Sequence, residues 1–188
     1  MPSHIVKYFI QLVLFGVLSM PAFAGADILP PPSDYVVDQA GIITQTDREM
    51  IKNWARELEQ KTSAQVAVLT VPSIGDESIE NYAVNVFKQW GIGQKQKDNG
   101  ILLVIAAQDR RLRIEVGYGL EGAVTDVQSH RIIEAIIVPE FKTGNFSQGV
   151  LKGTWAIVSL VAKEYNVKLS GSLKLYHPSK TPPVGSWF

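Results

Sequence analysis

The sequence contains no cysteine, and this absence excludes several kinds of chemistry. Disulfide bonds, thiol catalysis, zinc–thiolate sites and lipid attachment through a cysteine all require that side chain. Histidine is scarce as well, and His130 is the only one away from the two ends of the chain. A serine nucleophile needs a histidine as its base, and no Gly-x-Ser-x-Gly segment is present that would pair a serine with His130. Acyl-transfer catalysis is therefore disfavoured.

A surplus of either charge is also missing. The 18 basic and 18 acidic residues cancel to a net charge of +0. Nucleic acids and anionic membrane surfaces attract proteins through an excess of positive charge, so the composition favours neither as a partner. The sequence has no internal repeats, and its 188 residues suit one domain behind a leader.

The first 24 residues predict a signal peptide. His4 and Lys7 precede an apolar run over residues 8–20, which is shorter than the roughly 20 residues of a membrane-spanning helix. Pro21-Ala22-Phe23-Ala24 then fits the small-x-small cleavage pattern. We expect cleavage near Ala24 and a periplasmic or secreted location, with an uncleaved N-terminal anchor as the alternative.

The rest of the chain predicts one α/β domain. A Pro-rich leader spans 25–33, the domain spans 34–167, and 168–188 forms an extended or disordered tail. The run at 100–107 is continuously apolar, as in a central strand covered on both faces, and 111–117 alternates like its hairpin partner. Further strands are expected at 35–37 and 64–71, and helices after Thr44, after Ser78, from Thr125 or Asp126 to near Pro139, and from Asn145 or Ser147. The order β-α-β-α-β-β-α-α predicts a three-layer α/β/α sandwich with a mixed central sheet and helices on both faces.

Residues 117–122 match the dinucleotide-binding pattern G-x-G-x-x-G. The preceding strand is predicted to be the second arm of a hairpin, however, and not the first strand of a parallel βαβ unit. Glu121 would repel a pyrophosphate, and Asp126 would compete with it for the backbone N–H groups at the start of the helix. We therefore expect no nicotinamide cofactor, and no NAD retained on the purified protein.

The same loop is better interpreted as part of a cation site. Glu121 and Asp126 lie five residues apart in a glycine-rich loop, and Asp98-Asn99 forms an oxygen-rich turn before the central strand. Antiparallel pairing of 100–107 with 111–117 places residue 100 beside residue 118, so both turns emerge at one end of the sheet. Oxygen donors without histidine or thiol suit a hard cation, and calcium is the natural candidate. The alternative is that Asp98-Asn99 is an ordinary turn, Asp126 an ordinary helix cap and Glu121 a solvated loop residue.

Several segments in order resemble the TPM-domain family over about residues 34–166. They are Val37-Asp38-Gln39-Ala40-Gly41-Ile42-Ile43, Trp90-Gly91-Ile92-Gly93, Lys97-Asp98-Asn99-Gly100-Ile101-Leu102-Leu103, the stretch 109–122, Thr125-Asp126, Val138-Pro139-Glu140-Phe141 and Gly144-Asn145-Phe146. The resemblance implies an α/β/α sandwich and an exported bacterial protein, similar to thylakoid-lumen proteins that help photosystem II repair. It also implies that some relatives bind calcium and some hydrolyse phosphate esters weakly.

Carried over by motif, the resemblance implies a metal-binding cluster of Asp98, Asn99, Glu121 and Asp126, with Asp38 and Asp109 as weaker candidates. Many bacterial members continue into a transmembrane helix and a Gly-rich tail, whereas this sequence ends in Ser186-Trp187-Phe188. We therefore expect a freely soluble periplasmic protein.

Two functions use this acidic cluster. The first is a calcium-binding accessory module in assembly, repair or quality control of envelope proteins, with an envelope or membrane protein as partner. The alternative is a metal-dependent phosphatase in which Arg110, Arg111 or Arg113 holds phosphate oxygens. The other interpretation of these arginines is the charged face of an edge strand.

Overall fold

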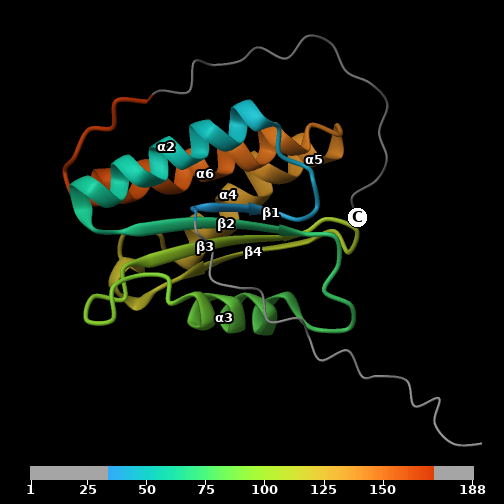
Figure 1. The fold of residues 1–188 in the computed structure, drawn as a ribbon, viewed down its shortest axis with the longest axis horizontal. Helices are drawn as coiled ribbons and strands as arrows, with labels where there is room; N and C mark the ends of the chain where they lie inside the picture. The colour runs from blue at the N-terminus through green and yellow to red at the C-terminus, as the bar shows by residue number, and fades with distance from the viewer. Residues whose placement is uncertain (1–33, 172–188) are drawn as a thin grey trace, which may run out of the picture.

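The apolar run that follows Asn99 forms the centre of a four-stranded sheet (Figure 1). A computed structural model of the protein describes residues 34–171. In it, β3 (Gly100–Ala106) lies between β2 (Gln65–Val71) and β4 (Arg111–Val116), and the short β1 (Val36–Asp38) completes the order β1-β2-β3-β4. The first three strands are parallel, and β4 is antiparallel to β3. The mixed sheet expected from the sequence is confirmed.

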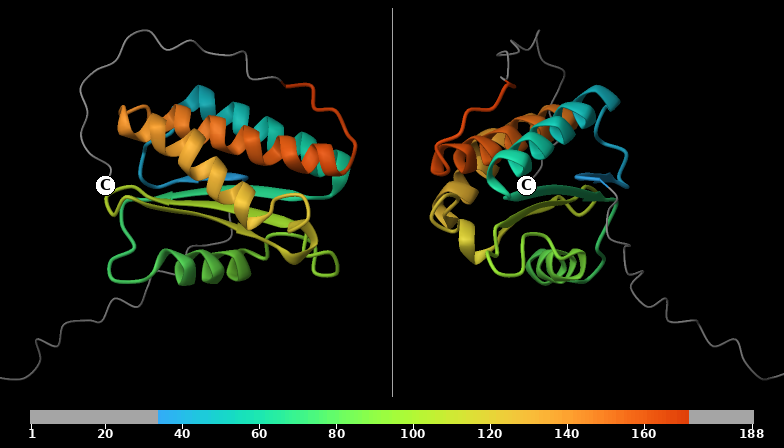
Figure 2. Two further views of the ribbon diagram at one scale, coloured as in Figure 1. Left: turned by 180° about the vertical axis from the view of Figure 1, so that it is seen from behind. Right: turned by 60° about the vertical axis from the view of Figure 1, so that its left-hand side comes forward.

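Helices cover both faces of the sheet (Figures 1 and 2). The helix α3 (Ile79–Trp90) lies on one face, and α2 (Gln45–Thr62) and α6 (Phe146–Glu164) lie on the other. Successive strand residues point to opposite faces, so Leu102 packs in the α3 core and Leu103 packs in the α2–α6 core. Both cores need apolar side chains from β3, which explains its unbroken apolar run. The three-layer α/β/α sandwich is therefore confirmed.

Two helices begin at the caps that the sequence indicates. Thr44 Oγ1 accepts a hydrogen bond from the Asp47 N–H at 3.2 Å, and Ser78 caps α3 in the same way. The carboxylate of Asp47 does not return to the cap, as a capping box would require. It is buried and accepts hydrogen bonds from Ser147 Oγ (2.5 Å) and Gln148 Nε2 (3.1 Å). This residue therefore joins the first turns of α2 and α6.

One helical rod precedes α6 and contains a wide turn. It consists of α4 (Asp126–Ile132), the π-helical η2 (Ile133–Ile137) and α5 (Val138–Lys142). The expectation that the helix ends near Pro139 is wrong, because the helix runs through this residue. A proline lacks the N–H of a regular helical bond, and its ring clashes with the carbonyl one turn earlier. The wide turn just before Pro139 accommodates both effects.

The chain beyond α6 runs back along α2. Lys61 Nζ donates to the Lys168 carbonyl at 2.6 Å, and the Ser170 N–H donates to Glu57 Oε1 at 2.8 Å. The predicted signal peptide, the Pro-rich leader and residues 172–188 of the predicted tail lie outside the described residues. Within residues 34–171, none of the helices combines the length and apolar character needed to cross a membrane.

Candidate functional site

The β3–β4 hairpin brings together the two loops from which the sequence predicts a cation site. Ile101 lies opposite Val116, and the Gly117 N–H donates to the Gly100 carbonyl at 2.8 Å. Residue 100 therefore faces residue 117, one position earlier than the sequence suggests. The Gly119 N–H donates to the Asp98 carbonyl at 3.1 Å, which confirms that both loops emerge at the same end of the sheet.

Two glycines of the G-x-G-x-x-G pattern serve this close contact between loops. A Cβ atom on Gly117 would lie 2.2 Å from the Asp98 carbonyl oxygen, and one on Gly119 would lie 1.9 Å from the Lys97 carbonyl oxygen. The segment that follows β4 is a short 3₁₀ turn, η1 (Tyr118–Leu120), anchored by the buried Leu120. The pattern thus has a packing explanation, and its strand is antiparallel to its neighbour, unlike the strand of a dinucleotide fold.

A polar cleft of about 340 Å³ opens beside β4. It lies between the edge of that strand, the loop after η1 and the first turn of α4. Its lining comprises Arg113, Ile114, Glu115, Val116, Glu121, Val124, Thr125 and Asp126. Three acidic residues and one arginine therefore line a single cleft.

The carboxylates of the cleft differ in what they already bind. Arg113 Nε donates to Glu115 Oε2 at 2.8 Å, so Glu115 is part of an ion pair. Glu121 and Asp126 are exposed, and neither forms an ion pair with another described residue. The two exposed carboxylates are the groups in this cleft that remain available to a ligand.

The start of α4 fixes the backbone around Asp126. Thr125 Oγ1 accepts from the Gln128 N–H at 3.3 Å, and Gln128 Oε1 accepts from the Thr125 N–H at 2.9 Å. This reciprocal capping box identifies Thr125 as the cap, which the sequence left open between these two neighbours. Asp126 occupies the first turn, where the partial positive charge of the helix end favours a carboxylate.

Asn99 has a structural role. Its side chain is buried, with the residue 1% exposed. Its Oδ1 accepts from the Gln94 N–H and its Nδ2 donates to the Ser63 carbonyl, both at 2.9 Å. Both ends of the amide are thus engaged in joining the end of α2 to the loop before β3. Asp98 is exposed with a left-handed φ of 45°, and neither residue lines the cleft.

The weaker candidate Asp38 lies at the opposite end of the sheet. Its side chain is 1% exposed and accepts hydrogen bonds from the Ile42 and Ile43 N–H groups, both at 3.1 Å. Thr70 Oγ1 and Arg48 also donate to it, at 2.5 and 2.9 Å. This carboxylate stabilises the turn after β1, and its hydrogen bonds leave no oxygen directed at solvent.

Asp109, the other weaker candidate, also lies at that far end. It accepts hydrogen bonds from the Ile74 N–H and from Ser73 Oγ, both at 2.7 Å. The backbone hydrogen bond from Ile74, followed by that from Ser73, holds the pKa of this carboxyl below its usual range. Its hairpin position and these bonds identify it as a loop anchor.

Of the six carboxylate or amide residues that the sequence suggests as ligands, two therefore line the cleft, Glu121 and Asp126.

The cleft meets the chemical requirement for a hard cation but not a preformed geometry. Its donors are oxygen atoms, which calcium and magnesium prefer. Across residues 34–171, however, no group of three or more histidine, aspartate or glutamate side chains is arranged to hold a metal ion. Ligands beyond Glu121 and Asp126 would have to come from water, from backbone carbonyl groups, or from Glu115 after release from Arg113. A site of this kind would be weak.

The sequence interpretation did not include Glu115, although the signal was present. Arg111, Arg113 and Glu115 alternate with apolar residues along β4, so they share one side of the edge strand. The structure also separates the three candidate arginines. Arg113 lines the cleft, whereas Arg111 Nη1 donates to the Glu77 carbonyl at 3.1 Å and Arg110 occupies the left-handed turn of the hairpin.

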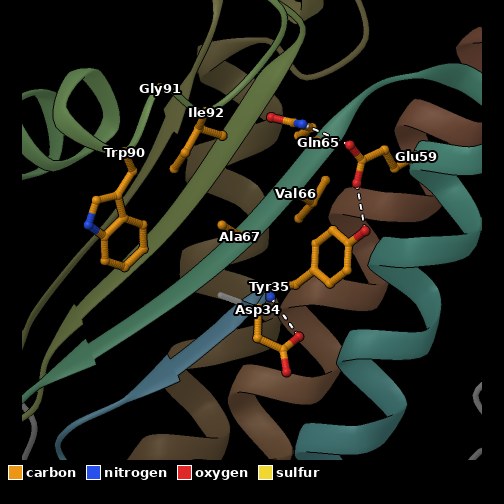
Figure 3. Close-up of a pocket in the computed structure, with 9 residues that line it drawn as sticks. All are labelled: Asp34, Tyr35, Glu59, Gln65, Val66, Ala67, Trp90, Gly91 and Ile92. Carbon is orange, nitrogen blue, oxygen red and sulfur yellow. Dashed lines mark hydrogen bonds between the residues drawn. The ribbon is translucent and has the colours of Figure 1, made fainter. Parts of the chain in front are cut away.

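A second pocket of about 340 Å³ lies beside β1 and β2 (Figure 3). Tyr35 Oη and Gln65 Nε2 donate to the two oxygens of Glu59, at 2.6 and 2.8 Å. Burial, together with the Glu59 hydrogen bond, raises the pKa of Tyr35 to about 12. The phenol therefore stays protonated at neutral pH, and the carboxylate is held by neutral donors. This network orders the end of α2 and offers no activated nucleophile.

Comparison with known proteins gives a consistent family match. The profile of the TPM domain matches residues 36–160. The solution structure of the N-terminal domain of a protein from P. gingivalis is 32% identical with a TM-score of 0.67, over 74% of this chain and 88% of that one. The BA42 protein from the psychrophilic Bizionia argentinensis is 25% identical with a TM-score of 0.55, over 65% of this chain and 83% of that one.

Plant proteins match a shorter part of the chain. Chloroplastic UPF0603 proteins from Oryza sativa subsp. indica and subsp. japonica are each 26% identical over 98 residues, or 52% of this chain. The match spans only 33% of the length of each rice protein.

Proposed function

The chain belongs to the TPM-domain family, and from this premise we propose that it is a non-catalytic accessory module that binds calcium weakly in the cleft beside β4. The observation that carries the proposal is the pair of exposed carboxylates, Glu121 and Asp126, on a backbone fixed by glycine contacts and a capping box. Such a site offers oxygen ligands to a hard cation at little cost, because neither carboxylate must leave an ion pair.

The lining of the cleft supports a binding role over catalysis. It contains no histidine, lysine or tyrosine, and its one hydroxyl, Thr125 Oγ1, is engaged in the helix cap. A hydrolytic mechanism would need a group that moves protons, and this lining supplies none besides the carboxylates that would hold the cation. We therefore propose that the bound cation helps the domain to contact an envelope or membrane protein during assembly, repair or quality control.

Export to the periplasm or beyond is part of this proposal. Calcium reaches millimolar concentrations outside cells, where modules with dissociation constants of about 0.1–1 mM are useful. The support is the signal-peptide pattern of residues 1–24, which lie outside the described residues. A weak cation site agrees with such a location because it would stay empty in the calcium-poor cytoplasm.

A second candidate function is supported by Arg113. Its guanidinium lines the same cleft as Glu121 and Asp126, so a phosphate ester could contact Arg113 while a divalent cation occupies the carboxylates. When bound, the cation would polarise a phosphate oxygen, and the side chain of Arg113 would orient the ester. Against this, Arg113 already pairs with Glu115.

The decisive experiment measures the melting temperature of the full chain in EDTA, then in calcium, then in magnesium. A site with a dissociation constant of about 1 mM would add about 1.4 kcal/mol at about 10 mM calcium, a rise of roughly 3–6 °C for a domain of this size. Glu121→Gln/Asp126→Asn should abolish the rise. The matched control Asp76→Asn/Glu80→Gln removes one loop and one first-turn carboxylate elsewhere and should retain it.

The same proteins separate the two candidate functions. If the protein is an accessory module, it hydrolyses p-nitrophenyl phosphate no faster than the Glu121→Gln/Asp126→Asn variant does, whether in EDTA, calcium or magnesium. Turnover that follows calcium or magnesium occupancy and falls by orders of magnitude in Arg113→Gln would establish the phosphatase. Absence of any melting shift with either ion would contradict both candidates.

A further inference from the structure

An apolar groove lies on the helical layer, away from the acidic cleft. It runs between the α4–η2 segment and the C-terminal half of α6, with a volume of about 370 Å³. Ile132, Ile136, Ala156 and Leu160 supply its apolar lining, and Gln128, Arg131, Ser159 and Lys163 supply the rest. The four residues from α6 are spaced as one stripe of a helix, so the groove follows that helix for two turns.

The groove exists because the two helices converge at one end and separate at the other. A Cβ atom on Gly149 would lie 2.6 Å from the Phe141 ring, and one on Gly153 would lie 2.5 Å from the Ile137 side chain. These glycines let α6 approach α5 and η2 closely. Away from this contact the paths of α6 and α4 diverge, as the left view of Figure 2 shows, and the groove lies between them.

The two ends of the groove differ in polarity. A Cβ atom on Gly153 would lie 3.8 Å from the Ile132 side chain, and Ile136 adjoins Ile137 in the sequence, so both residues lie toward the end where the helices converge. Arg131 and Lys163 lie toward the open end and are exposed, and neither forms an ion pair with another residue in the part of the chain that the structure describes. The acidic residues Glu134 and Glu164 are near them in sequence but do not line the groove.

From this arrangement we infer that the groove binds a single-chain anionic amphiphile, an alkyl chain that ends in a carboxylate. The chain lies against the apolar residues of η2 and α6, where its burial removes apolar surface from water. The head group lies at the open end, where Arg131 and Lys163 provide charge-assisted hydrogen bonds. The apolar lining favours an alkyl chain as the ligand, and the positive charges of Arg131 and Lys163 favour a negatively charged head group.

The test is an NMR titration of the full chain with decanoate below its micelle concentration, followed through the methyl groups of Ile132, Ile136 and Leu160. Decyltrimethylammonium, with the same chain length and the opposite charge, is titrated in parallel. We expect saturable shifts of these methyl groups with decanoate and at least roughly fivefold weaker binding of the cation, because two exposed charge contacts each contribute modestly.

Surface variants keep the result independent of folding. Arg131→Gln/Lys163→Gln should weaken decanoate binding roughly fivefold or more, whereas Lys88→Gln/Lys95→Gln removes the same charge from the α3 side and should leave it unchanged. Equal affinity of the groove variant and the control, equal binding of the two amphiphiles, or absent methyl shifts would each overturn the inference. Binding of an acidic amphipathic peptide in place of decanoate would overturn it too and assign the groove to a protein partner.

Discussion

The two ends of the sheet use the same kind of side chain in opposite ways. At the end of the sheet where β1 finishes, the side chain of Asp38 is buried and receives four hydrogen bonds, including one from Arg48. At the other end, where β3 begins and β4 ends, Glu121 and Asp126 are exposed and line a cleft. A carboxylate whose oxygens already accept hydrogen bonds from the protein, here called saturated, stabilises the fold. A carboxylate with free oxygens on a fixed backbone is available to bind a ligand. The acidic residues of this domain are therefore distinguished by their partners and not by their sequence motifs.

The largest effect should come from removing the saturated carboxylate. Asp38→Ala leaves two backbone N–H groups, a threonine hydroxyl and the Arg48 guanidinium without their acceptor, so the free energy of unfolding should fall by about 3 kcal/mol or more. Urea denaturation would measure the loss, with the exposed Asp76→Ala as a control expected within about 0.5 kcal/mol. A loss no larger than that of the control would remove the proposed difference between the two ends.

A smaller effect is expected from the backbone contact that shapes the cleft. Gly119→Ala places a methyl group 1.9 Å from the Lys97 carbonyl oxygen, so the two loops must separate at a cost of about 1–3 kcal/mol. Gly122→Ala is the matched control in the same loop, because a Cβ there meets no atom within 4 Å. Thermal unfolding of both variants measures the difference. Equal melting temperatures would indicate that the loops are not held against each other.

Another carboxylate whose oxygens both accept hydrogen bonds, Glu59, predicts a pH dependence. Tyr35 donates to it, and the pKa of Tyr35 is raised from 10.0 to about 12. The contribution of Tyr35 to the free energy of unfolding is therefore fully present below pH 10.0 and is lost as the pH rises through about 12. The urea midpoint of the protein should fall more steeply over this interval than that of Tyr35→Phe. The pKa of Tyr82 is also raised, but this residue is present in both proteins, and parallel curves would contradict the prediction.

The smallest effect should come from the free carboxylates themselves. In EDTA, Glu121→Gln/Asp126→Asn should change the free energy of unfolding by only about 0.5 kcal/mol, because exposed side chains without ion pairs contribute little. Urea denaturation beside Asp38→Ala gives the direct contrast. A loss comparable to that of Asp38→Ala would show that these residues, too, are structural.

The fold was predictable because its central signals are local. The unbroken apolar run of β3 follows from burial on both faces of the sheet, and the alternation along β4 follows from burial on one face. The cap residues Thr44 and Ser78 act within one turn and were predictable for the same reason. The helix through Pro139 was not, because a π turn absorbs the proline, and whether this is tolerated depends on packing against the glycines of α6.

The candidate site was only partly predictable, because side-chain partners come from distant segments. Asn99 looks like a ligand in a short motif, but its amide partners include Ser63 at the end of α2. Asp38 likewise depends on Thr70 and Arg48, which no local spacing identifies. The meeting of the two loops was predictable from the hairpin, since antiparallel pairing fixes which residues are neighbours. Whether each side chain faces the cleft or the protein depends on tertiary contacts.

The β3–β4 hairpin also has a kinetic consequence. Ala106 and Arg111 pair across a short turn, whereas β1 pairs with β2, and β2 with β3, only after a whole helix has been crossed, as in Val36 with Val68 and Gln65 with Gly100. The entropy lost on closing a loop grows with its length, so the hairpin is the pairing that the unfolded chain reaches at least cost. The framework of the acidic cleft would then assemble early during folding, and the saturated carboxylate of Asp38 would acquire its partners only when the parallel strands dock.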